Sequence, residues 1–116
     1  MLSGEEISQY QRHLSLPSFG SVAQGKLKCA SVLVIGAGGL GCPALQYLTA
    51  AGVGKIGIVD NDVVEVSNLQ RQIIHTTNSI GLLKTDSAKQ HILKINPSCR
   101  VDLFNQKLTN SNALEI

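Results

Sequence analysis

The stretch SVLVIGAGGLGCPALQYLTAAGVGKIGIVDNDVVEVSNLQR, residues 31–71, decides the fold of this 116-residue chain. It opens with an unbroken apolar run at residues 32–35, which is typical of a parallel strand buried on both faces. Glycines follow at positions 36, 38, 39 and 41, and three of them fit the pattern G-x-G-x-x-G. Such a turn lets the backbone bend tightly and present N–H groups at the start of the next helix, so the sequence predicts a phosphate-binding turn.

A second apolar run and a carboxylate complete the pattern. Residues 55–59 predict a second strand that delivers Asp60 about 20 residues after the glycines, where doubly wound folds place a carboxylate on a ribose hydroxyl. Helices are expected over residues 40–51 and 84–95, and a third strand over residues 100–106. This β-α-β-α-β order predicts an α/β fold, the first half of a Rossmann-like parallel sheet with flanking helices and the strand order third, second, first.

The chain divides into two parts. Residues 1–30 are interpreted as an N-terminal helical segment, and residues 31–116 as the first half of a nucleotide-binding domain. In the first part, Ser3 and Glu6 match a capping box, which predicts an amphipathic helix over residues 4–13.

Further helix ends are predicted from local residues. Ser67 is expected to cap a short helix that carries Arg71, and Thr85 is expected to cap the helix that begins at Lys84. A lysine at a helix N-terminus is unfavourable unless an anion is bound, which indicates a functional site; the alternative is a lysine that only aids solubility. Residues 109–116 are expected to open another helix.

Composition limits the function classes. Hydrophobic residues make up 43% of the chain, which is ordinary for a soluble domain. The net charge is only +2 and the basic residues are scattered, so neither a nucleic acid nor a membrane is expected as a partner. No apolar stretch reaches the roughly 20 residues that span a bilayer, and the acidic, polar start is unlike a signal peptide, so a cytoplasmic location is expected.

The cysteines are odd in number and widely spaced, at Cys29, Cys42 and Cys99. This argues against a disulfide framework and against a zinc site within the chain, and all three are expected as free thiols. Cys42 lies in the first helical turn after the glycines, where a dipole-lowered pKa and simple packing are both open, with packing favoured.

A polar segment follows the second strand and separates the candidate families. This segment is Ser-Asn-Leu-Gln-Arg-Gln, residues 67–72, and an ordinary dinucleotide-binding fold does not require it. Together with Gly-Ala-Gly-Gly-Leu-Gly-Cys-Pro (36–43), Ala-Gly-Val-Gly (51–54) and Val-Asp-Asn-Asp (59–62), it resembles the adenylyltransferases that activate ubiquitin-like proteins: MoeB, ThiF and the ubiquitin-activating enzymes. The resemblance covers residues 9–97 and is nearest to the molybdopterin-synthase adenylyltransferases, including their sulfurtransferase-fused members.

The resemblance implies an enzyme that uses ATP and magnesium. Such an adenylyltransferase modifies the C-terminal Gly-Gly carboxylate of a ubiquitin-like sulfur-carrier protein and releases pyrophosphate, for sulfur transfer in molybdenum cofactor biosynthesis or tRNA thiolation. An acyl-adenylate is a better acyl donor than a carboxylate, and catalysis would rest on positioning and charge neutralisation. A homodimer is implied for the full-length form.

The resemblance also implies site residues. Gly39 would contact the nucleotide through its backbone, and Asp60 would hold the ribose hydroxyls. Lys84 would bind the triphosphate, and Arg12 would reach the nucleotide of a partner subunit; the alternative for Arg12 is a solvated helix face. The segment around the phosphates would comprise Ser67, Asn68, Leu69, Gln70 and Arg71. Catalytic roles fall to Arg71, Lys84 and Arg12, and no metal ligand is assigned.

Other parts of the family pattern are absent from the chain: an Asp-Asn pair after the next strand, the Cys-x-x-Cys zinc pairs, and the thiol-bearing segment. The chain is therefore interpreted as an N-terminal fragment that is inactive alone, with zinc expected only in the missing part. Two other classes stay open. One is an NAD-dependent Rossmann oxidoreductase, and the other is a non-catalytic truncated chain that binds nucleotide or a partner.

Overall fold

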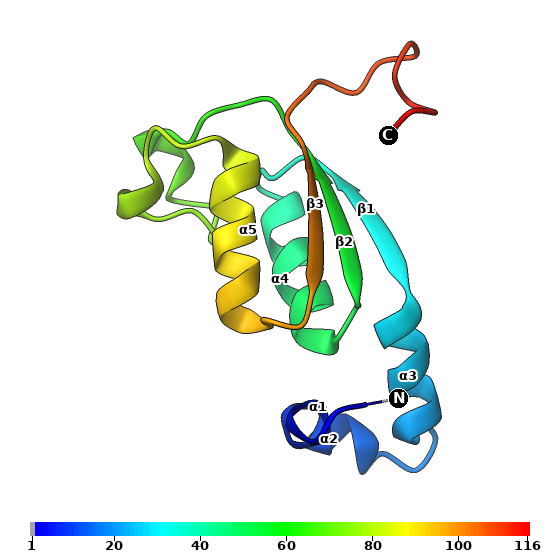
Figure 1. Ribbon diagram of the computed structural model, residues 1–116. Helices are drawn as coiled ribbons and strands as arrows, with labels where there is room; N and C mark the ends of the chain where they lie inside the picture. Colours follow the sequence, from blue (N-terminus) through cyan, green and yellow to red (C-terminus); the bar gives the residue numbers. More distant parts are fainter. Residues whose placement is uncertain (1) are drawn as a thin grey trace.

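The computed structural model describes residues 2–116, and Met1 of the predicted N-terminal segment lies outside the described residues. Within them, one parallel sheet is formed by β1 (Ser31–Ile35), β2 (Lys55–Val59) and β3 (Arg100–Phe104) (Figure 1). The strand order is β1-β2-β3, with every strand parallel to its neighbour. The predicted Rossmann-like order is confirmed, although the third strand ends at Phe104 rather than at residue 106.

Two crossover helices cover one face of the sheet. α4 (Gly41–Ala51) joins β1 to β2 and α5 (Lys84–Ile95) joins β2 to β3, and both lie on the same side of the strands in Figure 1. Their apolar stripes bury Leu45, Ala88 and Ile92 against the sheet. The strand residues of this core come from alternate positions: Val32, Val34, Ile56, Ile58, Val101 and Leu103. No helix within residues 2–116 has both the length and the apolar character needed to cross a membrane.

The prediction that the first strand is buried on both faces is wrong. Along β1 exposed and half-buried residues alternate, and Leu33 and Ile35 keep 44% and 58% of their surface exposed. The reason is that α4 and α5 cover one face only, while β1 is a sheet edge that pairs with β2 alone among the described residues. We call the uncovered side, with Leu33, Ile35, Gly57 and Phe104, the open face. A groove of about 260 Å³ runs over it, lined in part by Leu33, Gly57 and Phe104.

Within the described residues, the N-terminal segment forms three helices. Its helices are α1 (Gly4–Gln9), α2 (Gln11–Leu14) and α3 (Gly20–Cys29). The capping box of Ser3 and Glu6 is present, as predicted. The single helix expected over residues 4–13 is interrupted at Tyr10, where φ is −101° and ψ is 16°. Tyr10 is buried at this break, so a tertiary contact overrides the helical pattern.

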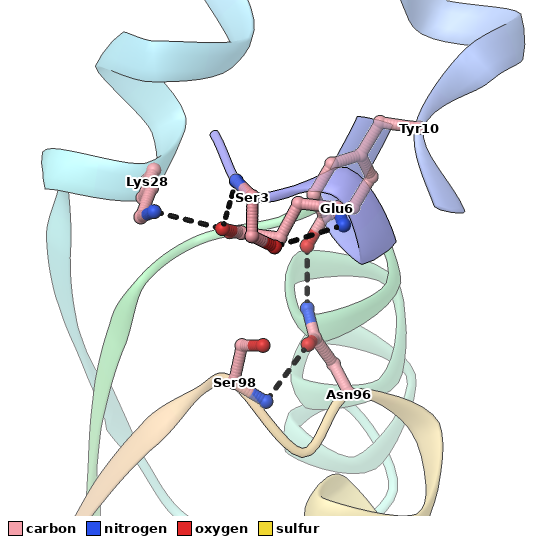
Figure 2. Close-up of polar contacts among 6 residues, drawn as sticks. All are labelled: Ser3, Glu6, Tyr10, Lys28, Asn96 and Ser98. Carbon is pink, nitrogen blue, oxygen red and sulfur yellow. Dashed lines mark hydrogen bonds and ion pairs between the residues drawn. The ribbon is translucent and has the colours of Figure 1, made fainter. Parts of the chain in front are cut away.

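A polar cluster fixes this segment to the rest of the chain (Figure 2). The Asn96 side-chain amide donates to the Tyr10 hydroxyl at 2.6 Å and to the Thr49 carbonyl at 3.2 Å. The Lys28 ammonium lies 2.7 Å from Glu6 Oε1, and this contact lowers the pKa of the Glu6 carboxyl. Asn96 follows α5 and Lys28 belongs to α3, so the cluster anchors α1 at the end of the sheet where the strands begin (Figure 1).

Irregular segments follow β2 and β3. The link from β2 to α5 contains the 3₁₀ helices η1 (Val66–Asn68) and η2 (Thr77–Ser79). The helix expected over residues 109–116 is not formed, and these residues make turns. Asn112 accepts the Thr109 N–H and donates to the Lys107 carbonyl, both at 2.8 Å, and such side-chain bonds compete with a helix. Leu114 is fully exposed, so its side chain adds no apolar packing that would stabilise a short helix there.

We predict that the 116-residue chain self-associates through β1 and the open face. Unpaired edge backbone beside exposed apolar side chains is a template for association. Ile35→Lys places a charge on the open face and should shift the sedimentation-velocity profile towards the monomer. Val22→Lys, an exposed position on α3, is the matched control and should leave the profile unchanged. A wild-type chain that stays monomeric, or variants that behave alike, would contradict the prediction.

Candidate functional site

The glycine turn between β1 and α4 presents backbone donors at the start of a helix. Gly36 has a φ of 96°, and a Cβ on Gly41 would collide with the Gly36 carbonyl oxygen, so both positions require glycine. Among the described residues, the N–H groups of residues 38–40 make no backbone hydrogen bond, and they lie at the N-terminus of α4. Unpaired donors and the helix dipole together suit an anion such as a phosphate.

Asp60 follows β2 and faces this turn. Its Oδ2 accepts the Ala37 N–H at 2.8 Å, and its Oδ1 accepts the Asp62 N–H at 2.8 Å. Each carboxylate oxygen keeps a second lone pair for an external donor. Asp60, Gly36, Asp62 and Gln106 are among the residues that line a pocket of about 230 Å³. The pocket lies at the carboxyl ends of the strands, the edge at which open α/β sheets bind ligands.

Lys84 is a nearly buried cation beside a second pocket. Its side chain is 8% exposed, and Nζ lies 3.9 Å from Oδ2 of Asp62, whose side chain is 68% exposed. Both residues line a pocket of about 200 Å³, together with Glu65 and Asn68. Because Asp62 borders this pocket and the pocket beside Asp60, the two pockets adjoin. The Asp62 carboxylate, 3.9 Å away, is too far for a hydrogen bond with the Lys84 ammonium. A nearly buried ammonium in this situation is suited to bind an anion.

The start of α5 differs from the prediction. Thr85 is not the cap: the N-cap residue is Leu83, which gives no side-chain cap hydrogen bond. Thr85 lies in the first turn, buried, and its hydroxyl has no hydrogen-bond partner among the described residues. An isolated bridge between Leu83 and Val63, and a 2.9 Å bond from the Lys84 N–H to the Asp62 carbonyl, hold the helix start instead. A tertiary contact therefore replaces the local cap.

The polar segment after β2 brings Arg71 to the glycine turn. Arg71 runs alongside Gly39, where an added Cβ would lie 3.7 Å from Arg71 Cδ. Its guanidinium donates from Nη1 to the Ser67 carbonyl at 3.1 Å. The structure thus places a cation beside the unpaired amides of the turn, on the surface of the protein.

The other residues of this segment have different environments. The prediction that Ser67 caps a helix is wrong, because Ser67 lies inside η1, whose N-cap is Glu65. The Glu65 N–H donates to Asn68 Oδ1 at 2.8 Å, so the buried Asn68 side chain caps this turn and also borders the lysine pocket. Within residues 2–116 the side chains of Ser67 and Gln70 make no hydrogen bond, and Leu69 is half-buried.

Arg12 is distant from these residues in its own chain. It is exposed on α2, while Tyr10, two residues earlier, lies against Gly52 at the C-terminal end of α4. The glycine turn lies at the opposite end of α4, whose 11 residues rise about 16 Å. The structure therefore does not bring Arg12 to the turn, and its role stays a prediction about a second subunit.

Behind the turn, two side chains converge on the Ala37 carbonyl oxygen. His75 Nε2 lies 2.9 Å from this oxygen, and His75 Nδ1 lies 2.7 Å from Ser87 Oγ. The Cys42 thiol donates to the same carbonyl at 3.4 Å. Burial lowers the pKa of His75 and raises the pKa of the Cys42 thiol. Of the two interpretations of Cys42, the structure supports packing, because Cys42 is fully buried in the hydrophobic core.

Sequence reasoning missed the parts of the site that lie behind the turn. Gln72 is buried, and its Nε2 would lie 3.8 Å from a Cβ on Gly38, while its Oε1 has no partner among the described residues. For His75 the sequence favours a structural hydrogen-bonding role over catalysis, and the structure shows such bonds, but the sequence did not identify Ala37 as a partner. Gln72 and His75 stand in an irregular loop, where a buried polar residue leaves no periodic signal in the sequence.

A family model described as the ThiF family matches residues 10–116. The chain belongs to the ThiF family. It is 57% identical over 113 residues to the adenylyltransferase and sulfurtransferase UBA4 of Scheffersomyces stipitis. It is 56% identical over 112 residues to a probable molybdopterin-synthase adenylyltransferase of Porphyra purpurea. These alignments cover 97% of the chain but 26% and 29% of the two relatives, so the chain spans less than a third of their length.

Solved structures share the fold of this ThiF-family chain. The E. coli tRNA N6-threonylcarbamoyladenosine dehydratase TcdA, in complex with ATP, matches with a TM-score of 0.93 at 30% identity, over 99% of this chain and 46% of that one. E. coli MccB with ATP matches with a TM-score of 0.80 at 32% identity, over 92% of this chain and 33% of that one. The Rossmann-like architecture is therefore that of the ThiF family.

Two glycines of the turn should respond differently to alanine. Gly41→Ala drives a Cβ into the Gly36 carbonyl and should lower the free energy of unfolding by about 3 kcal/mol or more. Gly39→Ala meets Arg71 only at an ordinary contact distance of 3.7 Å and should change it by less than about 1 kcal/mol. Urea unfolding of the two variants makes the comparison, and equal losses would show that the Gly36–Gly41 approach is not the constraint.

Histidine burial predicts a loss of stability in acid. Burial lowers the pKa values of His75 and His91 from 6.5, so below pH 6.5 the unfolded chain binds more protons than the folded chain. Stability therefore falls as the pH drops below that value. His75→Gln removes one such group and should flatten the slope by at most about 1.4 kcal/mol per pH unit. Urea unfolding over this pH range measures both slopes, and parallel slopes would mean that His75 titrates normally.

Proposed function

We propose that the protein carrying this chain activates a ubiquitin-like sulfur-carrier protein by transferring adenylate from ATP to the carrier's C-terminal Gly-Gly carboxylate. The observation that carries the proposal is the meeting of donors, a carboxylate and two cations at one edge of the sheet: residues 38–40, Asp60, Arg71 and Lys84. A nucleoside triphosphate requires donors and cations for its phosphates and an acceptor for its ribose.

The relatives support the same reaction class. Those at 57% and 56% identity are named adenylyltransferases, one of them for molybdopterin synthase and the other also a sulfurtransferase. The proposed carriers are therefore those of molybdenum cofactor biosynthesis or tRNA thiolation. A cytoplasmic location belongs to the same proposal, on the sequence argument given above.

Each part of the site has a separate task in this proposal. ATP would supply the adenylyl group that turns a carboxylate, a poor acyl donor, into an acyl-adenylate with release of pyrophosphate. The amides of residues 38–40 bind phosphate oxygens, and Asp60 orients the ribose through its free lone pairs. Arg71 and Lys84 offset the negative charge of the phosphates. Positioning and charge neutralisation suffice, with no covalent bond to the chain.

Magnesium fits this site as the companion of ATP. No group of three or more His, Cys, Asp or Glu residues within residues 2–116 is arranged to hold a metal ion. Mg²⁺ is usually held by one or two carboxylates together with substrate phosphates, so such a cluster is not required. The exposed carboxylate of Asp62 borders both pockets and is the described group placed for this contact.

A homodimer completes the proposal, and Arg12 is the reason. Arg12 is exposed on α2, about the length of α4 away from the turn of its own chain. A guanidinium held there by the Tyr10–Asn96 anchor serves a nucleotide only if that nucleotide is bound to another subunit. A planar cation with several donors is suited to a phosphate.

Calorimetry with ATP and with NAD tests the proposal. The glycine turn and Asp60 would serve either ligand, whereas Lys84 and Arg71 favour the more highly charged triphosphate. We expect ATP to bind at least about tenfold more tightly than NAD. The reverse order would replace the adenylyltransferase with an oxidoreductase. ATP binding without carrier-dependent exchange of pyrophosphate would identify a non-catalytic nucleotide-binding protein.

Lys84→Ala and Arg71→Ala should each lower carrier-dependent exchange of pyrophosphate into ATP by about 10- to 100-fold. Each variant removes a cation that offsets the negative charge of the phosphates. The assay uses the protein of full family length. Lys94→Ala, which removes an exposed lysine near the other end of α5, is the matched control and should exchange at the wild-type rate. A wild-type rate in either test variant would remove that residue from the catalytic assignment.

A further inference from the structure

Side chains from other elements hold Ala37 at both of its backbone polar groups. Its N–H donates to Asp60, after β2, at 2.8 Å. Its carbonyl accepts from His75, in the loop between η1 and η2, at 2.9 Å. Ala37 is fully buried. Hydrogen bonds to Asp60 and His75 therefore fix the two peptide groups that flank Ala37 in the glycine turn.

Fixing the Ala37 carbonyl also fixes the direction of the next N–H group. The described chain contains no cis peptide bond, and in a trans peptide the C=O and the following N–H point in opposite directions. Because the carbonyl points to the buried His75, the Gly38 N–H points away from it, where it has no backbone partner. Rotation of this peptide would turn a carbonyl oxygen towards an anion, and Gly38, which lacks a Cβ, does little to oppose the rotation.

His75 is itself braced from α5. Its Nδ1 lies 2.7 Å from Ser87 Oγ, and both side chains are buried. A carbonyl oxygen only accepts hydrogen bonds, so the proton is on Nε2, and Nδ1 accepts the Ser87 hydroxyl. These two partners select one neutral tautomer of the imidazole, and burial, which lowers its pKa, favours the same neutral form.

We propose that His75 is a positioning residue of the nucleotide site, whose Nε2–H holds the Ala37–Gly38 peptide in the orientation that presents the Gly38 N–H to a phosphate group. The identity of the ligand rests on the proposed function, whereas the peptide orientation belongs to the chain without ligand. Cys42 does not replace His75, because its thiol is a weak donor at 3.4 Å from the same oxygen. His75 acts through Ala37 and does not itself touch the ligand.

Two substitutions separate the two hydrogen bonds of His75. His75→Gln keeps an amide that can donate from the position of Nε2 to Ala37. His75→Asn keeps a polar group near the position of Nδ1, within reach of Ser87, and loses the bond to Ala37. His91→Gln replaces a half-buried histidine of α5 and is the control. The free energy of unfolding of each variant separates a general loss of stability from an effect on the turn.

Calorimetry with ATP and with inorganic pyrophosphate measures the effect on the site. We expect His75→Asn to weaken both ligands about tenfold, and His75→Gln to stay within about twofold of wild type. In pyrophosphate exchange, His75→Asn should raise the KM for ATP and leave kcat unchanged. If His75→Asn binds both ligands as wild type does, or if the Gln and Asn variants weaken binding equally, His75 is only structural and the proposal is overturned.

A second readout does not depend on the ligand. The ¹H–¹⁵N signal of Gly38 in the unliganded protein should keep its wild-type position in His75→Gln and should move or broaden in His75→Asn, because the peptide can then rotate. An unchanged Gly38 signal in His75→Asn would also overturn the positioning role. A wild-type protein that binds neither ATP nor pyrophosphate would instead overturn the proposed function, so the two failures are distinguishable.

Discussion

The hydrogen bond from the Ala37 amide to Asp60 Oδ2, 2.8 Å long, joins the two halves of the candidate site. It depends on the register of β1 and β2, which pairs Ile35 with Val59 and so brings the ends of both strands level. The Gly36 N–H continues the ladder by donating to the Val59 carbonyl at 2.7 Å. A short aspartate side chain then reaches across to the turn. Strand pairing, and not loop flexibility, therefore sets the distance between the amides of the glycine turn and the Asp60 carboxylate.

Features with a local pattern were predictable from the sequence. The glycine turn, the second strand and Asp60 each follow from residue types at fixed spacing, and the strand order follows from the alternation of strands and helices. The burial of β1 was not predictable, because an apolar run does not reveal whether a second layer covers Leu33 and Ile35. The cap predicted at Thr85 failed because tertiary contacts hold the start of α5. The cap predicted at Ser67 failed because Glu65 and Asn68 cap η1 instead.

The candidate site likewise combines features that the sequence predicts with features that only the fold reveals. The unusual place of Lys84 at a helix N-terminus was visible as a local conflict of charge, but its near burial and its approach to Asp62 arise only in the fold. Asp60 and Asp62 are close in sequence and take different directions, one towards Ala37 and the other towards Lys84. The contact of His75 with Ala37 spans 38 positions of the chain, and no pattern in a single sequence encodes a contact at that separation.

The cysteines differ in their access to solvent. Cys42 and Cys99 are buried, and burial raises the pKa of both thiols. Cys29 is exposed at the last residue of α3, directly before the free edge of β1. The strand between Cys29 and the glycine turn is about 16 Å long. A thiol-reactive dye would thus attach at Cys29, where its fluorescence anisotropy reports on edge pairing while the pocket beside Asp60 stays unlabelled.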